Sequence, residues 1–295
     1  MAGTYTAIDL SQVPAPSVVE TIDYEIILAQ MIEDLRLRMP AFTALVESDP
    51  AYKILEVCAY REVILRQRVN EAARAVMLSY ATGTDLENLA ALFGVTRLVI
   101  DPGDPDALPP VPATYETDTD LRRRTQLSLE GFSTAGPSGA YIYHALSAHG
   151  DVLDVSATSP TPGDVLISIL SRSGSGVPGT DVLNVVEAAL NDESVRPLCD
   201  TVTVQAAGIV SYAISATLQM LPGPDPSVVL AEAQVAVATY AAAQHRMGLD
   251  IAISGIHAAL HRPGVAQVNL TSPTANITIS ETQASWCTAI SVTMA

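Results

Sequence analysis

A chain of 295 residues, 48% of them hydrophobic, can bury at least one substantial core and is long enough for more than one domain. Its 32 acidic and 15 basic residues give a net charge of −17, and only 5% of its residues are aromatic. Such a charge repels phosphate backbones and anionic membranes, and so few rings offer little to stack on bases, so the composition disfavours nucleic-acid binding and membrane-surface binding.

Three further features bear on the compartment. The first ten residues have neither the basic nor the apolar stretch of a secretory signal, which predicts a cytoplasmic origin. The most apolar long segment, residues 228–243, contains Glu232 and predicts a buried or amphipathic helix rather than a membrane span. The cysteines at 58, 199 and 287 are odd in number and far apart, which suggests neither a disulfide framework nor a zinc ribbon.

The first hundred residues show helical periodicity. Apolar spacing predicts a helix over residues 17–38 that stops near Pro40, and a longer one over 50–80 with Asp49 as N-cap and Pro50 in its first turn. Glu62 and Arg66 are ordered for an i,i+4 ion pair on the second helix. Its surface is a candidate seam for partner helices, and the predicted interface residues are Tyr60, Arg61, Leu65, Arg68, Val69, Ala72 and Val76.

A third helix and an unusual linker follow. Thr84 and Glu87 have capping-box spacing, and Gly94 suits the position just after a helix. From Asp101 to Thr114 the chain contains five prolines, and from Asp101 to Asp120 it contains six acidic residues and no basic one. We expect a linker or an extended arm there.

The remainder alternates between helical and strand-like patterns. Helices are predicted at 120–132, 138–148 and 181–190, and strands at 152–157, 165–170, 201–205 and 209–220. A weak repeat is also visible: Ser138-Gly139-Ala140 and Ser254-Gly255-Ile256 each lead into a strand, a Ser-Pro-Thr turn and a second strand. A duplicated unit of this kind predicts two small sheets with helices on one face, a split βαβ-like design.

The predicted fold class is therefore α+β. Its expected parts are an N-terminal helical region at 1–98, a Pro-rich acidic linker or arm at 99–119, a first α/β domain at 120–221 and a second at 222–295.

Catalytic and cofactor-binding signatures are weak. His257 and His261 have the i,i+4 spacing of two zinc ligands, but no glutamate follows the first histidine and no third ligand is evident. The sequence has no Gly-x-Ser-x-Gly elbow, no GxGxxG fingerprint and no Walker motif. We predict no catalytic residues, no bound metal and no cofactor.

Two charged groups have alternative interpretations. Asp118 with Asp120, or Asp151 with Asp154, could form a catalytic carboxylate pair, although each lies where acidic residues commonly cap helices or turns. The basic run at 122–124 could be a docking patch for a partner. Because three acidic residues precede the run, local neutralisation is the simpler interpretation.

Several stretches, in the same order along the chain, are similar to the baseplate J-like proteins. They are Glu47-Ser48-Asp49-Pro50, Lys53-Ile54-Leu55-Glu56, Tyr60-Arg61-Glu62, residues 65–73, residues 81–90, Phe93-Gly94-Val95-Thr96-Arg97, Leu121-Arg122-Arg123-Arg124, residues 133–137 with Ala140-Tyr141, and Val195-Arg196-Pro197-Leu198 with Asp200. The matches span roughly residues 47 to 200, and the short Pro-rich segment between Arg97 and Tyr115 departs from the pattern.

This resemblance implies a structural, non-enzymatic wedge protein in the baseplate of a contractile phage tail or tailocin. It implies assembly in the host cytoplasm and incorporation into the tail. The implied partners are a helical-bundle wedge protein, a sheath-initiator-like protein and further copies of the chain, with no nucleic acid and no membrane. The N-terminal helices would form the bundle, and the C-terminal domains would close a ring around the hub and take part in triggering. Two other interpretations remain: a tail-associated metal-dependent hydrolase using His257 and His261, and a tail-completion or tip adaptor.

Overall fold

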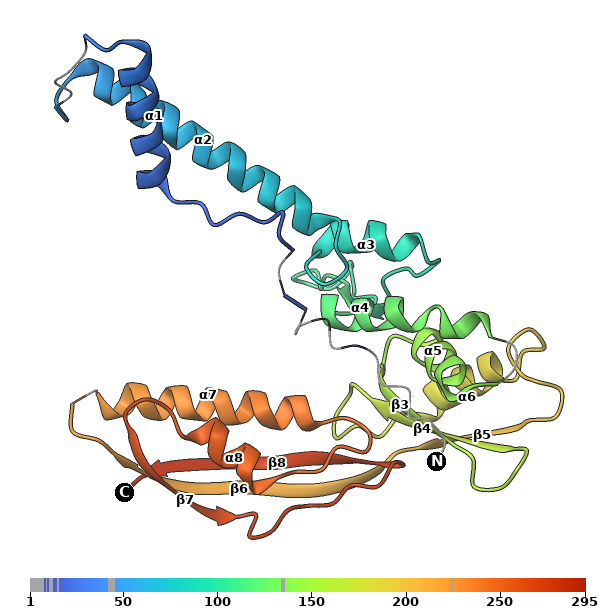
Figure 1. Ribbon diagram of the computed structural model, residues 1–295. Coiled ribbons are helices and arrows are strands. Elements are labelled where there is room, and N and C mark those ends of the chain that lie inside the picture. The colour runs from blue at the N-terminus through green and yellow to red at the C-terminus, as the bar shows by residue number, and fades with distance from the viewer. Residues whose placement is uncertain are drawn as a thin grey trace. The chain divides into compact units, whose positions relative to one another are not determined.

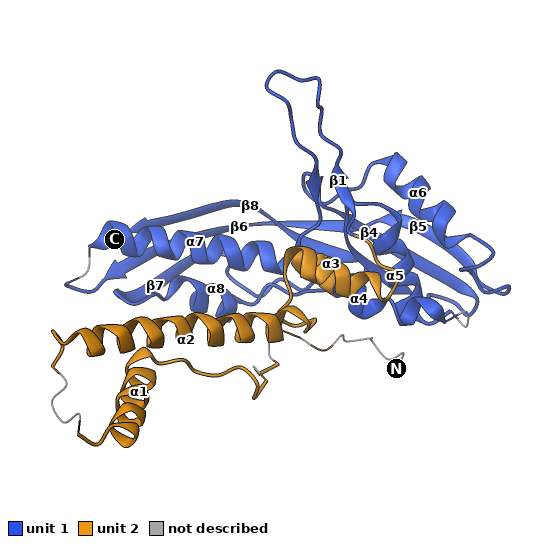
Figure 2. Cartoon of the chain, turned by 90° about the horizontal axis from the view of Figure 1, so that it is seen from above, with its two compact units in different colours: residues 1–6, 97–117, 123–295 blue, residues 7–96, 118–122 orange. Residues whose placement is uncertain are grey.

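The computed structural model describes residues 8, 10, 13–14, 16–41, 46–133, 136–223 and 225–295. The chain divides into two compact units (Figure 2). Unit 2 comprises residues 7–96 and 118–122, and unit 1 comprises mainly residues 97–117 and 123–295. An N-terminal helical part followed by small sheet domains confirms the predicted α+β class.

Unit 2 is helical. Its elements are α1 (Tyr24–Arg38), α2 (Pro50–Ala75), α3 (Gly83–Ala91) and the first turn of α4 (Asp118–Leu127). Asp49 is the N-cap of α2, as predicted, and its carboxylate accepts the Ala51 N–H at 2.8 Å. The first helix begins at Tyr24 rather than at residue 17, because Asp23 caps it in the same way. The second ends at Ala75 rather than at residue 80, since the chain turns there and the Met77 N–H bonds to the Arg74 carbonyl.

Of the predictions for the two ends of α3, one is wrong and one is confirmed. The predicted capping box is wrong: Thr84 lies inside the helix, and the N–H of Gly83 instead donates to the Asp118 carboxylate at 3.0 Å, a residue 35 positions away. At the other end Gly94 has φ +70°, its N–H bonds to Ala91, and the Val95 N–H bonds to Ala90. This pair of bonds is a Schellman motif, so the predicted role of Gly94 is confirmed.

Unit 1 contains an arm and two mixed sheets. Its elements are β1 (Val99–Asp101), β2 (Thr114–Tyr115), the rest of α4, η2 (Glu130–Phe132), α5 (Ser138–Ala148), β3 (Val152–Thr158), β4 (Asp164–Ser171), α6 (Thr180–Leu190), β5 (Thr201–Ala206), β6 (Gly208–Met220), α7 (Pro226–Gln244), α8 (Ile253–Leu260), β7 (Val265–Ser272) and β8 (Gln283–Met294). The predicted helix over 120–132 is therefore two elements, α4 and η2.

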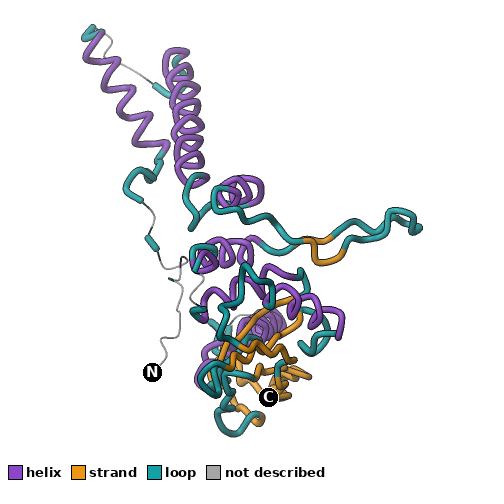
Figure 3. The backbone as a smooth tube through the Cα atoms, turned by 90° about the vertical axis from the view of Figure 1, so that its right-hand side faces the viewer, coloured by secondary structure: helices purple, strands orange, loops and turns teal. Residues whose placement is uncertain are grey.

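The Pro-rich segment forms a hairpin arm. Strands β1 and β2 pair antiparallel at its base, and an extended loop continues beyond them (Figure 3). The base is held by buried groups: the Glu116 carboxylate accepts the Leu98 N–H at 2.9 Å and pairs with Arg124, while Arg97 donates to the Glu116 carbonyl at 2.7 Å. The arm is thus fixed at its root by a tertiary ion pair.

The first sheet has the order β3-β4-β5, with β3 antiparallel and β5 parallel to the central strand. Its core combines α5 and α6 with the sheet, and includes the fully buried Ala145, Ile167, Ile169, Val186 and Leu190. Strands β4 and β5 are parallel and are connected through α6, as in other βαβ units, and α5 adds to the same core.

The second sheet has the order β7-β6-β8, again with one antiparallel and one parallel neighbour. Helices α7 and α8 cover one of its faces (Figure 1). Among the described helices, α7 has the length and composition of a membrane span, with mean hydropathy 1.2. Its Val229, Ala233, Val237 and Ala241 are buried in the core of this sheet, which is the arrangement of a domain's core helix.

Candidate partner-binding face of helix α2

Helix α2 has two apolar sides, and one of them packs within unit 2. Helix α1 lies beside its N-terminal half (Figure 1), where Ile27, Leu28 and Ala59 are buried together. Tyr52, Leu55 and Val63 add to the same cluster. This side holds the helical hairpin together.

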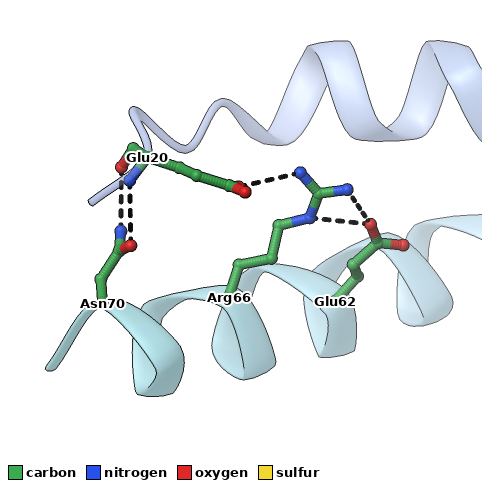
Figure 4. A network of polar contacts seen from close by, with 4 residues as sticks. All are labelled: Glu20, Glu62, Arg66 and Asn70. Carbon is green, nitrogen blue, oxygen red and sulfur yellow. Dashed lines mark hydrogen bonds and ion pairs between the residues drawn. The ribbon is translucent and has the colours of Figure 1, made fainter. Parts of the chain in front are cut away.

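A polar network fixes the chain before α1 to the C-terminal half of α2 (Figure 4). The side chain of Asn70, which is buried, accepts the Glu20 N–H at 3.0 Å and donates to the Glu20 carbonyl at 2.8 Å. Arg66 donates twice to Glu62, at 2.9 and 2.6 Å, and once to the Glu20 carboxylate at 3.1 Å. The predicted Glu62–Arg66 pair is confirmed, and it has a third member from a distant segment.

Replacing Asn70 by alanine is expected to destabilise the protein by about 2 kcal/mol, because two hydrogen bonds to backbone groups of Glu20 are lost. Urea unfolding measures the loss, and hydrogen exchange should show faster exchange at the Glu20 amide. Tyr80→Phe is a matched control, since it removes one exposed hydrogen bond, to the Val13 carbonyl, and should change stability less. Unchanged Glu20 exchange in the alanine variant would contradict this role.

Among the residues that the structure describes, those on the opposite side of α2 are exposed. We call this side the outer face and define it by Ile54, Val57, Cys58, Arg61, Ile64, Leu65, Arg68, Val69, Ala72 and Val76, all of which are exposed. Leu65, Val69 and Val76 are 66%, 59% and 69% exposed. Leu65 lies about 200° around the helix from Val63, which packs with α1, so the two apolar sides are nearly opposite.

All seven predicted interface residues are exposed, and six of them belong to the outer face. Tyr60 lies on the flank, about 140° around the helix from Leu65. The predicted interface residues did not include Ile54, Val57, Cys58 and Ile64. A signal for the first of these was available, because Ile54, Cys58, Arg61, Leu65, Arg68 and Ala72 follow one another at spacings of 4, 3, 4, 3 and 4, which is a heptad seam.

The other candidate groups have structural contacts. Asp118 caps α3, and the Asp151 carboxylate accepts hydrogen bonds from the hydroxyls of Ser171 and Ser173. Asp154 is buried and accepts bonds from Arg123, Val155 and Met247. No three His, Cys, Asp or Glu side chains come together as a metal site anywhere in the described ranges, which include His257 and His261.

The three consecutive arginines each make contacts within the chain. Arg122 donates to the carbonyls of Leu78 and Ala81 at 2.7 and 2.6 Å. Arg123 pairs with Asp154, and Arg124 is buried against Glu116. Of these contacts, only the pair of Arg124 with Glu116 is the predicted one, in which an acidic residue before the run neutralises an arginine.

Comparisons with known proteins agree with the resemblance. Family models match residues 47–104 (Baseplate J-like N-terminal domain), 133–206 (Baseplate J-like central domain) and 212–293 (Baseplate J-like protein C-terminal domain). Baseplate protein J of Escherichia phage P2 is 52% identical over 288 residues, which cover 95% of each chain.

A solved structure is more distantly similar. In the 6-fold symmetrised cryo-EM baseplate of the anti-feeding prophage, a chain has 15% identity and a TM-score of 0.42, over 62% of this chain and 44% of that one, so this chain spans less than half of its length. The three domain matches and the 52% identity over nearly the whole length carry the assignment: the chain belongs to the baseplate J-like protein family.

Proposed function

We propose that this chain is a wedge component whose outer face on α2 binds a helix of a neighbouring baseplate protein. That it is a structural baseplate protein of a contractile tail, part of the virion, follows from its family and its identity to Baseplate protein J. The single observation that supports the docking site is the outer face itself: an exposed and largely apolar face on a 26-residue helix.

The physical argument rests on the exposed area. Large apolar side chains gathered on one side of a surface helix are typical of protein interfaces. Covering Leu65 and Val69 alone is worth about 2–4 kcal/mol before the cost of association. The opposite side of α2 already packs against α1, so a neighbour can cover the outer face without unfolding the hairpin.

The remaining roles extend this proposal. Further copies of the chain and a sheath-initiator-like protein would be neighbours in the wedge, and the sheets of unit 1 would contact the next wedge in a ring around the hub. Such a ring is built from heterologous interfaces that close by rotation. Assembly would take place in the host cytoplasm, and rearrangement of the ring contacts would contribute to triggering.

We also propose that the chain is not an enzyme. Of the acidic residues considered as catalytic pairs, Asp118, Asp151 and Asp154 contact amides, hydroxyls or a guanidinium of their own chain, which is typical of capping and packing groups. Metal analysis of the purified protein separates this proposal from the metal-dependent hydrolase that His257 and His261 would suggest. About one equivalent of tightly bound zinc, lost on replacing either histidine by alanine, would overturn it.

Replacing Leu65 and Val69 by aspartate is expected to reduce co-purification with the products of neighbouring baseplate genes by more than about 10-fold, because two charges would enter an apolar interface. Folding should be unaffected, since both side chains are exposed. Leu198→Asp is the matched control, because Leu198 is fully exposed in another part of the chain and should leave co-purification unchanged.

Two exposed cysteines provide an independent test of docking on the outer face. Cys58 lies on the outer face, and Cys199 lies in unit 1. In a complex with the neighbouring proteins, maleimide labelling of Cys58 should slow while that of Cys199 continues. Equal labelling of both in the complex, together with normal co-purification of the aspartate variant, would refute docking on the outer face.

A further inference from the structure

The outer face carries positive charge at two regular positions. Arg61 and Arg68 are seven residues apart, which is two helical turns or about 10.5 Å, and both lie in the same column of the heptad seam as Ile54. The side chain of Arg68 is 81% exposed. A seam that is otherwise apolar therefore presents two guanidinium groups, in a chain whose net charge is −17.

The acidic residues of α2 are largely engaged elsewhere. Glu62 is bonded to Arg66, and Glu56 to Lys53 at 2.8 Å. Glu71 lies 3.9 Å from Arg68, with both side chains largely exposed to water, where such a pair is weak. Within the described ranges no ion pair involves Arg61, so α2 pairs only one of the two seam arginines, and only weakly.

These charges disfavour pairing of two outer faces from two copies. In a parallel pair of α2 helices, Arg61 would face Arg61 and Arg68 would face Arg68 of the second copy. In an antiparallel pair centred near Leu65, the two arginines of each copy would alternate along the seam with those of the other, about one turn apart. Both symmetric arrangements bring four guanidinium groups together in a surface that excludes water, where like charges repel strongly.

Helix α1 of a second copy is also a poor match. Its exposed residues include Glu25, Glu33 and Asp34, but Arg36 and Arg38 follow the last two within about one turn. Glu25 and Glu33 are eight residues apart and diverge by about 80° around α1, so they do not match two arginines in one heptad column, and Arg36 and Arg38 would add repulsion. The observed charges thus favour a different protein.

We propose that the occupant of the outer face is an acidic amphipathic helix of another protein, with carboxylates spaced seven residues apart opposite Arg61 and Arg68. This inference rests on the proposed function and specifies the partner of the same site. Apolar contact along Ile54, Leu65 and Val69 supplies the affinity, and the two arginines select the partner and fix its register.

The test uses two labelled heptad peptides with identical apolar positions, one with glutamate and one with lysine at the positions flanking the seam. The full chain should bind the glutamate peptide at least about 10-fold more tightly than the lysine peptide, measured by fluorescence anisotropy. The double variant R61E/R68E should reverse this preference, and R61Q/R68Q should abolish it. Binding of the glutamate peptide should also weaken as salt rises.

Equal binding of the two peptides, tighter binding of the lysine peptide, or binding of neither would overturn the inference. Self-association of the full chain by light scattering that is lost in the Leu65 and Val69 aspartate variant would overturn it too, since a second copy would then occupy the face. A different result would refute the proposed function: normal co-purification of the Leu65 and Val69 aspartate variant with the neighbouring baseplate proteins. Loss of co-purification without charge preference would leave the docking site intact and refute only its acidic partner.

Discussion

Replacing Arg124 by methionine is expected to destabilise unit 1 by about 3–5 kcal/mol, because it leaves the Glu116 carboxylate buried without its cation. Glu116 and Arg124 are 2% and 5% exposed. The guanidinium Nε lies 3.0 Å from one carboxylate oxygen, Nη2 contacts the other, and Nη1 donates to Ser147 at 3.2 Å. Urea unfolding of the full chain, followed by circular dichroism, measures the change.

The double variant E116Q/R124M is the matched control. It removes both charges and keeps an oxygen that can accept the Leu98 N–H, so it should recover at least half of the lost stability. Amide exchange at Leu98, at the root of the hairpin arm, should be fastest in the single variant, slower in the double variant and slowest in the parent. A single variant within about 1 kcal/mol of the parent would show that water reaches Glu116.

Replacing Asp154 by alanine is expected to cost about 2–4 kcal/mol and to loosen the junction between the two sheets of unit 1. The carboxylate accepts bonds from Arg123 at 2.7 Å, Val155 at 2.9 Å and Met247 at 3.0 Å. Val155 belongs to the first sheet, whereas Met247 follows α7, 93 positions from Asp154. Loss of the acceptor leaves the Met247 N–H unsatisfied, so its hydrogen exchange should accelerate.

The Asp154→Asn variant separates the effect of losing the charge from the effect of losing the side chain. Its amide oxygen can still accept one N–H, so its stability should fall between those of the parent and the alanine variant. Arg246 also donates a hydrogen bond to the Leu153 carbonyl at 2.8 Å, which is a second contact across the junction. The double variant Arg246→Ala with Asp154→Ala should therefore lose more stability than either single variant. Unchanged exchange at Met247 in every variant would show that the junction is held by apolar packing alone.

Local features were predicted closely wherever their signals are local. The helix over 138–148 has the predicted bounds, and the four strands between 152 and 220 differ from prediction by at most one residue at either end. Alternating apolar residues and flanking Gly and Pro define such elements within a few positions. The Asp49-Pro50 start of α2 and the Gly94 end of α3 are predictable for the same reason.

Strand pairing was not predictable. Both copies of the weak repeat contain a helix, a strand, a turn and a strand, as expected. In the first copy the two strands pair with each other, as β3 and β4, whereas in the second β7 and β8 lie on either side of β6. Alternation shows which residues share a face of a strand, but the neighbouring strand is chosen by long-range contacts.

Sequence periodicity by itself determined that Leu65, Val69 and Ala72 share one side of a helix, since α-helical geometry is local. Tertiary structure alone decided that α1 covers the opposite side, at Ala59, and leaves these residues exposed. It likewise decided that Asp118 caps α3 and that Arg124 meets Glu116. Whether a face or a charge is covered depends on neighbours that are distant in the chain, and only the folded chain brings them together.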